Sequence, residues 1–314
     1  MFRLEWKDVG ISQLAVIPQA GLFLPVPLNP IATFDRKIKL CNRIDLAKNV
    51  GLEFGPLSRP VVTKAEGDVR YVDAMTTAEL RKQFEKNTQH DLNELVEISY
   101  VWNGEGLRQV VGPDIDFDYS IASHVIEHTP DAIGWLNDML SVLRDGGILA
   151  LAVPDKRFTF DVMRPVSPCA LFIDNWLRKE RRPTPAHVFD AFSQVVKVEL
   201  EEFTGLSKGT LDPKKLTRIF TDESALALTR ETLDQGLYRD CHTYVFTPRS
   251  FLEVLRMLIS IGILKARILD FYDTAILAQE FIAVLQKADE VDVSVELAHI
   301  DEMLAQLPVT PARN

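Results

Sequence analysis

Residues 117–154 read FDYSIASHVIEHTPDAIGWLNDMLSVLRDGGILALAVP and decide the fold. The first part, up to Val125, is typical of a strand, and 147–154 form a second β-rich run. Between them, apolar residues recur at helical spacing: Ile133, Leu136, Met139, Leu140 and Leu143. Thr129 is the expected N-cap with Pro130 at the first helical position, and Gly146 is expected to end the helix in a left-handed conformation. A strand, a helix and a second strand in this order predict a parallel βαβ unit.

The pentapeptide HVIEH at 124–128 matches the H-x-x-E-H signature of a zinc peptidase family. That site needs both histidines on one face of a helix. Here the strand extends through the first histidine and the helix begins only after His128. No third ligand is evident at helical spacing, so the sequence predicts no metal site.

The rest of the chain repeats the alternation of strands and helices. Further strands are expected at 49–55, in VRYVD ending at Asp73, in EISYVW ending at Trp102, and at 266–273 and 280–287. A helix capped by Thr247 precedes the last two strands. The pattern predicts an α/β protein with a mostly parallel sheet. The expected organisation is an irregular, proline-rich arm at 1–47, a core at 48–155 and 241–288, a mostly helical insertion at 156–240 and a tail at 289–314.

Composition excludes several classes of function. The 314 residues carry a net charge of -10, whereas nucleic-acid binding normally needs a basic surface. The three cysteines are far apart in the sequence, which favours a reducing cytosol over a disulfide framework. The first residues lack the basic segment followed by an apolar segment that is typical of a signal peptide. Four prolines interrupt the uncharged stretch 10–34, so stable membrane insertion is not expected.

Polar residues and glycine lie at the predicted carboxyl ends of the strands, where open α/β sheets bind ligands. These residues are Gly55, Asp73, Asn103, His124 and Asp155. A glycine at the end of the first strand allows a ligand to approach the backbone closely. An acidic residue about twenty positions further on can reach ribose hydroxyls in nucleoside-binding folds. Together they predict a nucleoside-containing cofactor.

Four segments resemble successive motifs of class I S-adenosylmethionine-dependent methyltransferases, in the bacterial branch that acts on small molecules and glycans. They are VGLEFGPLSRP, VRYVD, FDYSIASHVIEHTPD and SVLRDGGILALAVPDKRFTFD. The resemblance implies a Rossmann-like, seven-stranded, mostly parallel sheet with an antiparallel last strand, helices on both faces and a helical insertion after the fifth strand. The first motif departs from the family's E-x-G-x-G, because Pro56 and Leu57 follow Gly55.

The resemblance also implies roles for individual residues. Glu53, Gly55 and Pro56 would lie by the amino-acid end of the cofactor, and Asp73 would accept hydrogen bonds from both ribose hydroxyls. Asn103 or Glu105 would lie by the adenine, and Ser123 would line the site near the sulfonium.

The general base that would take a proton from the acceptor is expected among His124, Glu127, His128 and Asp155. His242 is more readily explained as a half-buried strand histidine. Arg157 and Arg164 suggest an anionic acceptor, because arginine binds phosphate and carboxylate in a bidentate manner.

The predicted function is transfer of a methyl group to a hydroxyl of a small metabolite or glycan precursor. A catalytically silent, methyltransferase-like interaction module is the first alternative. An NAD(P)-dependent oxidoreductase is the second, and the absence of G-x-G-x-x-G disfavours it. Neither the acceptor nor the oligomeric state is specified by the sequence.

Overall fold

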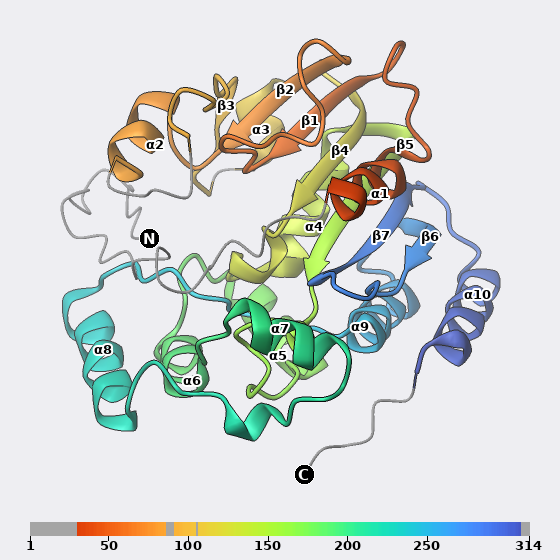
Figure 1. Ribbon diagram of the computed structural model, residues 1–314. Helices are drawn as coiled ribbons and strands as arrows, with labels where there is room; N and C mark the ends of the chain where they lie inside the picture. Colours follow the sequence, from red (N-terminus) through yellow and green to blue (C-terminus); the bar gives the residue numbers. More distant parts are fainter. Residues whose placement is uncertain (1–29, 86–90, 105, 309–314) are drawn as a thin grey trace.

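The computed structural model describes residues 30–85, 91–104 and 106–308. Seven strands form one sheet in the order β3-β2-β1-β4-β5-β7-β6 (Figure 1). The neighbours from β3 to β5 are parallel, and β7 is antiparallel to both β5 and β6. This topology confirms the predicted Rossmann-like sheet. The strands are β1 Val50–Phe54, β2 Asp68–Asp73, β3 Tyr100–Val101, β4 Phe117–Ser123, β5 Leu143–Pro154, β6 Ala266–Tyr272 and β7 Glu280–Lys287.

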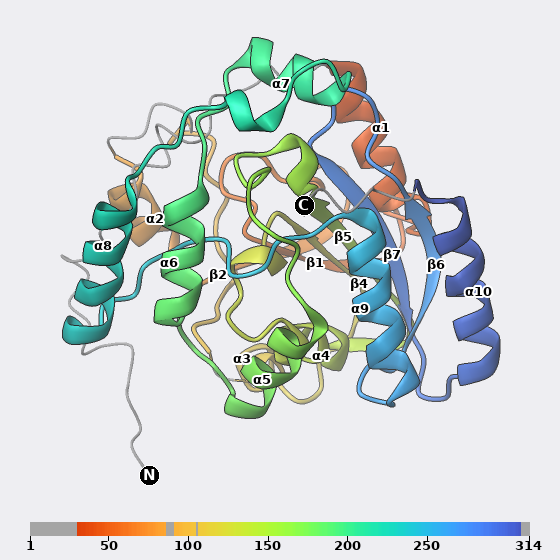
Figure 2. The same ribbon diagram turned by 90° about the horizontal axis from the view of Figure 1, so that it is seen from below.

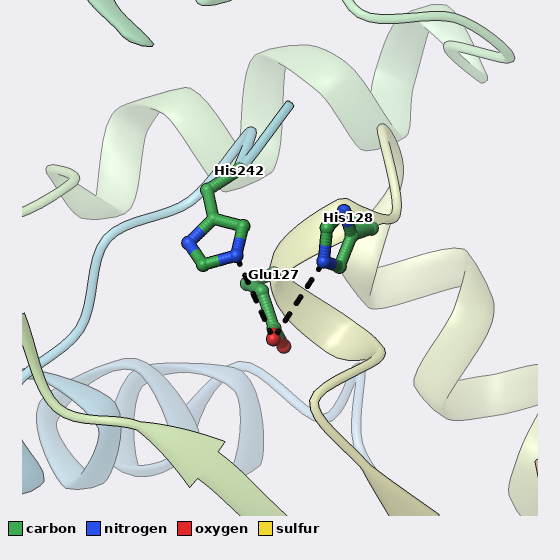
Figure 3. Close-up of side chains that lie close together, drawn as sticks. All are labelled: Glu127, His128 and His242. Atoms are coloured by element: carbon green, nitrogen blue, oxygen red, sulfur yellow. Dashed lines mark ion pairs between the residues drawn. The ribbon is translucent and has the colours of Figure 1, made fainter. Parts of the chain in front are cut away.

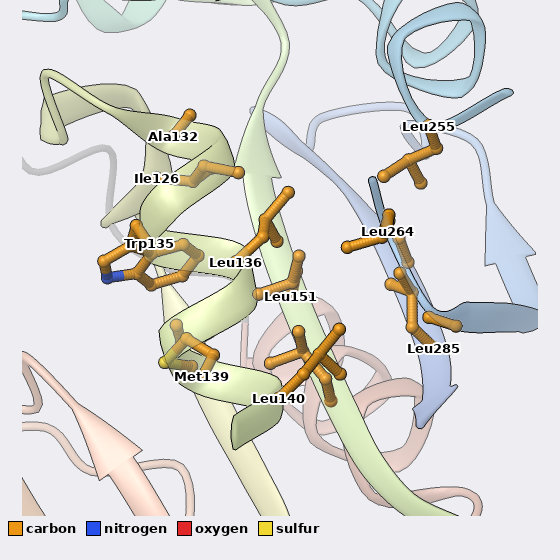
Figure 4. Close-up of a cluster of buried hydrophobic side chains, with 14 of the residues drawn as sticks. Ile126, Ala132, Trp135, Leu136, Met139, Leu140, Leu151, Leu255, Leu264 and Leu285 are labelled. Atoms are coloured by element: carbon orange, nitrogen blue, oxygen red, sulfur yellow. The ribbon is translucent and has the colours of Figure 1, made fainter. Parts of the chain in front are cut away.

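Alternation along β5 divides the core between the two faces of the sheet, because successive side chains of a strand point to opposite sides. Leu149, Leu151 and Val153 pack in the larger cluster, which includes residues of five α-helices; Figure 4 shows part of it. These helices are α3 Leu107–Val111, α4 Ala132–Ser141, α5 Cys169–Arg178, α9 Pro248–Ser260 and α10 Val293–Gln306. Ala150 and Ala152 pack on the opposite face, which α1 (Pro30–Cys41) covers through Leu40.

The start of α4 differs from the prediction. The strand ends at Ser123 instead of continuing to Val125, and a 3-10 turn, η4 (Ile126–His128), follows. Asp131 is the N-cap in place of Thr129, and its carboxylate accepts a hydrogen bond from the Gly134 amide. Aspartate is at least as good an N-cap as threonine, and the 3-10 turn already occupies the residues before Thr129.

The end of α4 also differs. The helix stops at Ser141 and β5 begins at Leu143, four residues earlier than expected. Gly146 does adopt a positive φ of 75°, but inside β5, where the register with β4 shifts. The glycine therefore accommodates an irregularity of the strand instead of a helix end. By contrast, Thr247 caps α9 as predicted.

The segment between β5 and α9 is rich in helices. It contains α5 Cys169–Arg178, α6 Pro185–Gln194, α7 Leu200–Ser207 and α8 Asp222–Gln235, besides the 3-10 turns η5 Lys156–Phe158 and η6 Pro213–Lys215. Figures 1 and 2 show these helices gathered at the end of the molecule to which β4 and β5 point. They therefore lie at the carboxyl edge of the central strands, where open α/β sheets in general bind ligands.

Much of the expected N-terminal arm, residues 1–29, lies outside the described residues. Its end, from Pro30, forms α1 and is not irregular. The short helix α2 (Thr77–Gln83) follows β2 and begins with a capping box. No helix within the described ranges has the length and apolar character of a membrane span.

Candidate active site

The chain leaves β4 through a strained residue. His124 has a φ of +54°, which is uncommon for a residue other than glycine and costs on the order of 1 to 3 kcal/mol. Two contacts hold it: its amide donates to the Ala152 carbonyl (2.9 Å), and its Nε2 lies 2.7 Å from Glu280 Oε2. Strain maintained in this way is characteristic of functional sites. It also turns the following 3-10 segment, η4, away from the strand direction.

Glu127, on η4, is the centre of a histidine cluster. Its side chain has no exposed surface, and neither carboxylate oxygen has a hydrogen-bond donor among the described residues. Three imidazoles surround Oε1. His128 Nε2 and His242 Nε2 lie at 3.9 Å each (Figure 3), and His124 Nδ1 lies at 3.7 Å. A buried carboxylate without hydrogen bonds is unfavourable unless a positive charge accompanies it. We call Glu127, His128 and His242 the Glu127 cluster.

A second set of carboxylates orients two of these imidazoles. His128 Nδ1 donates to Asp240 Oδ1 at 3.0 Å, and His242 Nδ1 donates to Asp161 Oδ2 at 2.5 Å. Arg164 Nη1 in turn donates to Asp161 Oδ1 at 2.8 Å. An ionised carboxylate can only accept hydrogen bonds, so Nδ1 of each ring carries a proton. Both Nε2 atoms are therefore turned towards Glu127.

These contacts change the ionisation of the cluster. Burial lowers the pKa of His128, but Asp240 and Glu127 outweigh it and raise the value to about 9. Burial also raises the pKa of Asp161. His242 and Arg164 outweigh this effect and hold the pKa well below its usual range. In the absence of another cation, His128 is therefore protonated at neutral pH, and Asp161 is ionised.

The end of β4 is also tied to two distant elements. Arg36 on α1 forms an ion pair with Glu280 at the start of β7 (Nε to Oε1, 2.6 Å) and donates to the Ser123 hydroxyl. Burial raises the pKa of Glu280, but Arg36 and His124 more than offset this and lower it. Ser123 and His124, both predicted from the sequence, thus belong to one network.

The cofactor side predicted from the sequence lies at the ends of β1, β2 and β3. Gly55 has a φ of +61° and follows the Phe54–Val72 pair, so it lies beside Asp73. Burial raises the pKa of Asp73 to about 6, although the amides of Ala74 and Met75 stabilise its ionised form. Asn103 is half-buried after β3, and Pro56 is buried after Gly55. Glu105 lies outside the described residues.

Glu53 has a different environment from its predicted neighbours. It is buried, and its two carboxylate oxygens accept hydrogen bonds from the amides of Val61 (2.6 Å) and Val62 (3.1 Å). Burial raises its pKa to about 7 despite these bonds. Its carboxylate therefore orders the loop after β1.

Asp155 and the two arginines of the insertion have protein partners. The buried Asp155 carboxylate receives hydrogen bonds from Arg157, with the shortest at 2.6 Å, and from the Thr274 hydroxyl at 2.8 Å. Arg164 is 1% exposed and contacts Asp161 and Asp190. Asp155 thus differs from Glu127, whose carboxylate has no hydrogen-bond donor in the part of the chain that the structure describes. Both guanidinium groups already have anionic partners.

The environment of His242 differs from the one that the sequence predicts. It lies in an irregular segment, not in a strand, and it is buried, not half-buried, with 4% of its surface exposed. Asp161 and Asp240 were not identified as candidates at all. The D-x-H spacing of Asp240 and His242 was the one local signal available, since 115 residues separate His242 from Glu127.

No protein-family model and no curated protein matches the sequence. Solved structures with a similar arrangement include an S-adenosylmethionine-dependent methyltransferase from Clostridium acetobutylicum, 8% identical, with a TM-score of 0.41 over 81% of this chain and 90% of that one. The CcbJ methyltransferase from Streptomyces caelestis is 10% identical, with a TM-score of 0.39 over 81% and 89%. A protein described as a zinc-dependent alcohol dehydrogenase from Rhodobacter sphaeroides is 13% identical, with a TM-score of 0.41 over 81% and 89%. The site is therefore interpreted from its own residues.

Proposed function

We propose that this protein transfers a methyl group from S-adenosylmethionine to a hydroxyl of a small metabolite or glycan precursor. The observation that carries the proposal is the placement of Gly55 and Asp73 side by side at the carboxyl edge of the sheet. The strand order reverses at β1, which has β2 on one side and β4 on the other. Ligands of open α/β sheets bind in the crevice at such a reversal.

From these positions we infer which part of the cofactor each residue would contact. Asp73 at the end of β2 would accept hydrogen bonds from the ribose hydroxyls, and Asn103 after β3 would lie by the adenine. Gly55 would permit close approach of the amino-acid end, because it presents no Cβ. The sulfonium would then lie towards the end of β4, near Ser123 and His124.

The chemistry on the acceptor side needs alignment and one proton acceptor. S-adenosylmethionine would supply an activated methyl group to the acceptor oxygen, and the electron pair of the broken carbon–sulfur bond would leave on sulfur as S-adenosylhomocysteine. Alignment of the three atoms can supply about 7 to 11 kcal/mol. We assign the proton to His124 Nδ1, since Nε2 donates to Glu280 and Glu127 Oε1 lies 3.7 Å from Nδ1. The two carboxylates would stabilise the imidazolium that forms.

Two observations disfavour the NAD(P)-dependent alternative. The dinucleotide-binding order 3-2-1-4-5-6 has no strand inserted between its last two, whereas here β7 lies antiparallel between β5 and β6. The glycine-rich pyrophosphate motif is absent as well.

Thermal-shift and calorimetric titrations with S-adenosylmethionine, S-adenosylhomocysteine and NAD test the proposal. Both sulfur nucleosides should stabilise the wild type, by about 2.7 kcal/mol at 100 times the dissociation constant. The Asp73→Ala variant should lose the effect, and Asp234→Ala, which removes an exposed carboxylate of α8, should retain it. Binding of NAD alone would refute the proposal. Cofactor binding without turnover on any hydroxyl acceptor would favour the interaction module.

A further inference from the structure

We propose that Glu127, His128 and His242 bind a divalent transition-metal ion such as Zn²⁺. Their ligand atoms all lie within 4.8 Å of one another, and Glu127 Oε1 is 3.9 Å from each of the two Nε2 atoms. Zinc binds imidazole nitrogen and carboxylate oxygen at about 2.0 to 2.2 Å. Two atoms separated by 3.9 Å can therefore bind the same ion.

The surroundings of the two histidines match those of metal ligands. A histidine that binds a metal through one nitrogen usually donates the other N–H to a carboxylate or a carbonyl, which sets the tautomer and the orientation of the ring. His128 does this with Asp240 and His242 with Asp161, through Nδ1 in both cases. Arg164 holds Asp161 in place in turn. The lone pairs of the two Nε2 atoms, one from each histidine, are thereby directed at one point.

The buried atoms directed at this point have no hydrogen-bond partner. Both oxygens of Glu127 and Nε2 of His242 are buried without one among the described residues. Polar atoms in that state are rare in folded proteins and indicate strain, a catalytic role or an unplaced water or ion. Around the two imidazoles are the carboxylates of Glu127, Asp161 and Asp240, and the Arg164 guanidinium contacts Asp161. A divalent cation would compensate this excess of negative charge.

Backbone hydrogen bonds fix the two segments that carry the ligands. The amides of Thr243 and Tyr244 donate to the Glu127 carbonyl at 2.7 and 3.2 Å, and the Thr243 hydroxyl donates to the same oxygen at 2.8 Å. The site is thus organised before an ion arrives. Side chains of two histidines and one carboxylate suit zinc and other ions that prefer imidazole, and they leave coordination positions open.

The zinc peptidase signature does not explain this site. His124, the first residue of HVIEH, is directed at Glu280 and is not one of the three ligand residues. The third ligand, His242, comes from the far side of the helical insertion. The inference does not rest on the proposed function, because binding of the ion can be measured without any turnover.

Metal analysis and calorimetric titration of the full chain test the inference. After removal of bound ions with a chelator, titration with Zn²⁺ should give one site per chain. Glu127→Gln and His242→Ala should weaken binding at least about 100-fold, and Asp161→Asn about 10- to 100-fold. Co²⁺ should give a visible absorption spectrum in the wild type that Glu127→Gln lacks. The control His299→Ala, a half-buried histidine of α10, should bind as the wild type does.

Because a core variant can fail to fold, circular dichroism of each variant accompanies the titration. Asp240→Asn, which changes the more exposed carboxylate behind His128, should weaken binding about 10- to 100-fold without removing a ligand. A wild type that takes up no stoichiometric Zn²⁺ would overturn the inference. Binding that survives in folded Glu127→Gln and His242→Ala would overturn it equally. Neither result would affect cofactor binding at Asp73, which the nucleoside titration measures separately.

Discussion

Asp161 Oδ2 and His242 Nδ1 are 2.5 Å apart, although 81 residues separate them in the chain. Both side chains are almost completely buried, and Arg164 provides the second partner of the carboxylate. The pair connects the beginning of the helical insertion with the segment that leaves it. It therefore holds the His242 ring against the start of the insertion, while Thr243 joins the same segment to the Glu127 carbonyl of η4.

Breaking this pair should destabilise the protein strongly. The Asp161→Asn variant leaves the Arg164 guanidinium buried with less compensation, and removing one partner of a buried ion pair typically costs about 3 to 5 kcal/mol. Urea unfolding should show a loss of this size. Asp174→Asn removes the partner of Arg178 in an exposed pair and should change the free energy of unfolding by less than about 1 kcal/mol. Equal effects of the two substitutions would contradict the assigned role of Asp161.

Cofactor affinity should depend on pH through Asp73. Its pKa is raised to about 6 by burial, and ribose hydroxyls donate to the ionised carboxylate. Affinity for S-adenosylhomocysteine should therefore be constant above about pH 6 and fall about tenfold per unit below it. Asp73→Asn should bind weakly at every pH, whereas Asp234→Asn should follow the wild type. A flat profile for the wild type between pH 5 and 7 would show that Asp73 does not contact the ribose.

The buried Glu53 should make stability depend on pH in the opposite sense to most carboxylates. Its pKa rises from 4.5 to about 7, so the folded state binds the proton more tightly than the unfolded state does. This contribution is complete below about pH 4.5 and is lost as the pH rises through 7. Between pH 4.5 and 7, the free energy of unfolding of the wild type should fall by up to about 3 kcal/mol relative to that of Glu53→Gln, since one pKa unit corresponds to about 1.4 kcal/mol. A difference independent of pH in urea unfolding would argue against an ionising Glu53.

Replacing His124 should separate turnover from cofactor binding. Asparagine tolerates the left-handed backbone at this position but provides no basic nitrogen. With an acceptor identified, His124→Asn should lower kcat about 10²- to 10⁴-fold and leave affinity for S-adenosylmethionine unchanged. His299→Asn serves as the matched substitution and should retain activity. Wild-type turnover in His124→Asn would show that another group of the site takes the proton from the acceptor.

The sequence by itself determined the strands of the sheet and placed Gly55 and Asp73 at the ends of two of them. The β-rich run at 147–154, the Thr247 cap and these strand-end residues depend on interactions within a few residues, and such patterns can be read locally. The boundaries around α4 were less accurate, because a 3-10 turn and a strand irregularity competed with ordinary caps.

Only the tertiary structure decided what each polar side chain contacts. Glu53 accepts hydrogen bonds from an adjacent loop, Asp155 binds Arg157, and Glu127 contacts His242 from the far side of the insertion. Local patterns do not encode such contacts, since the contacts depend on strand order and on how long connections pack against one sheet edge. The physical reason is that burial forces charged groups to find partners, and the folded chain supplies those partners from distant segments.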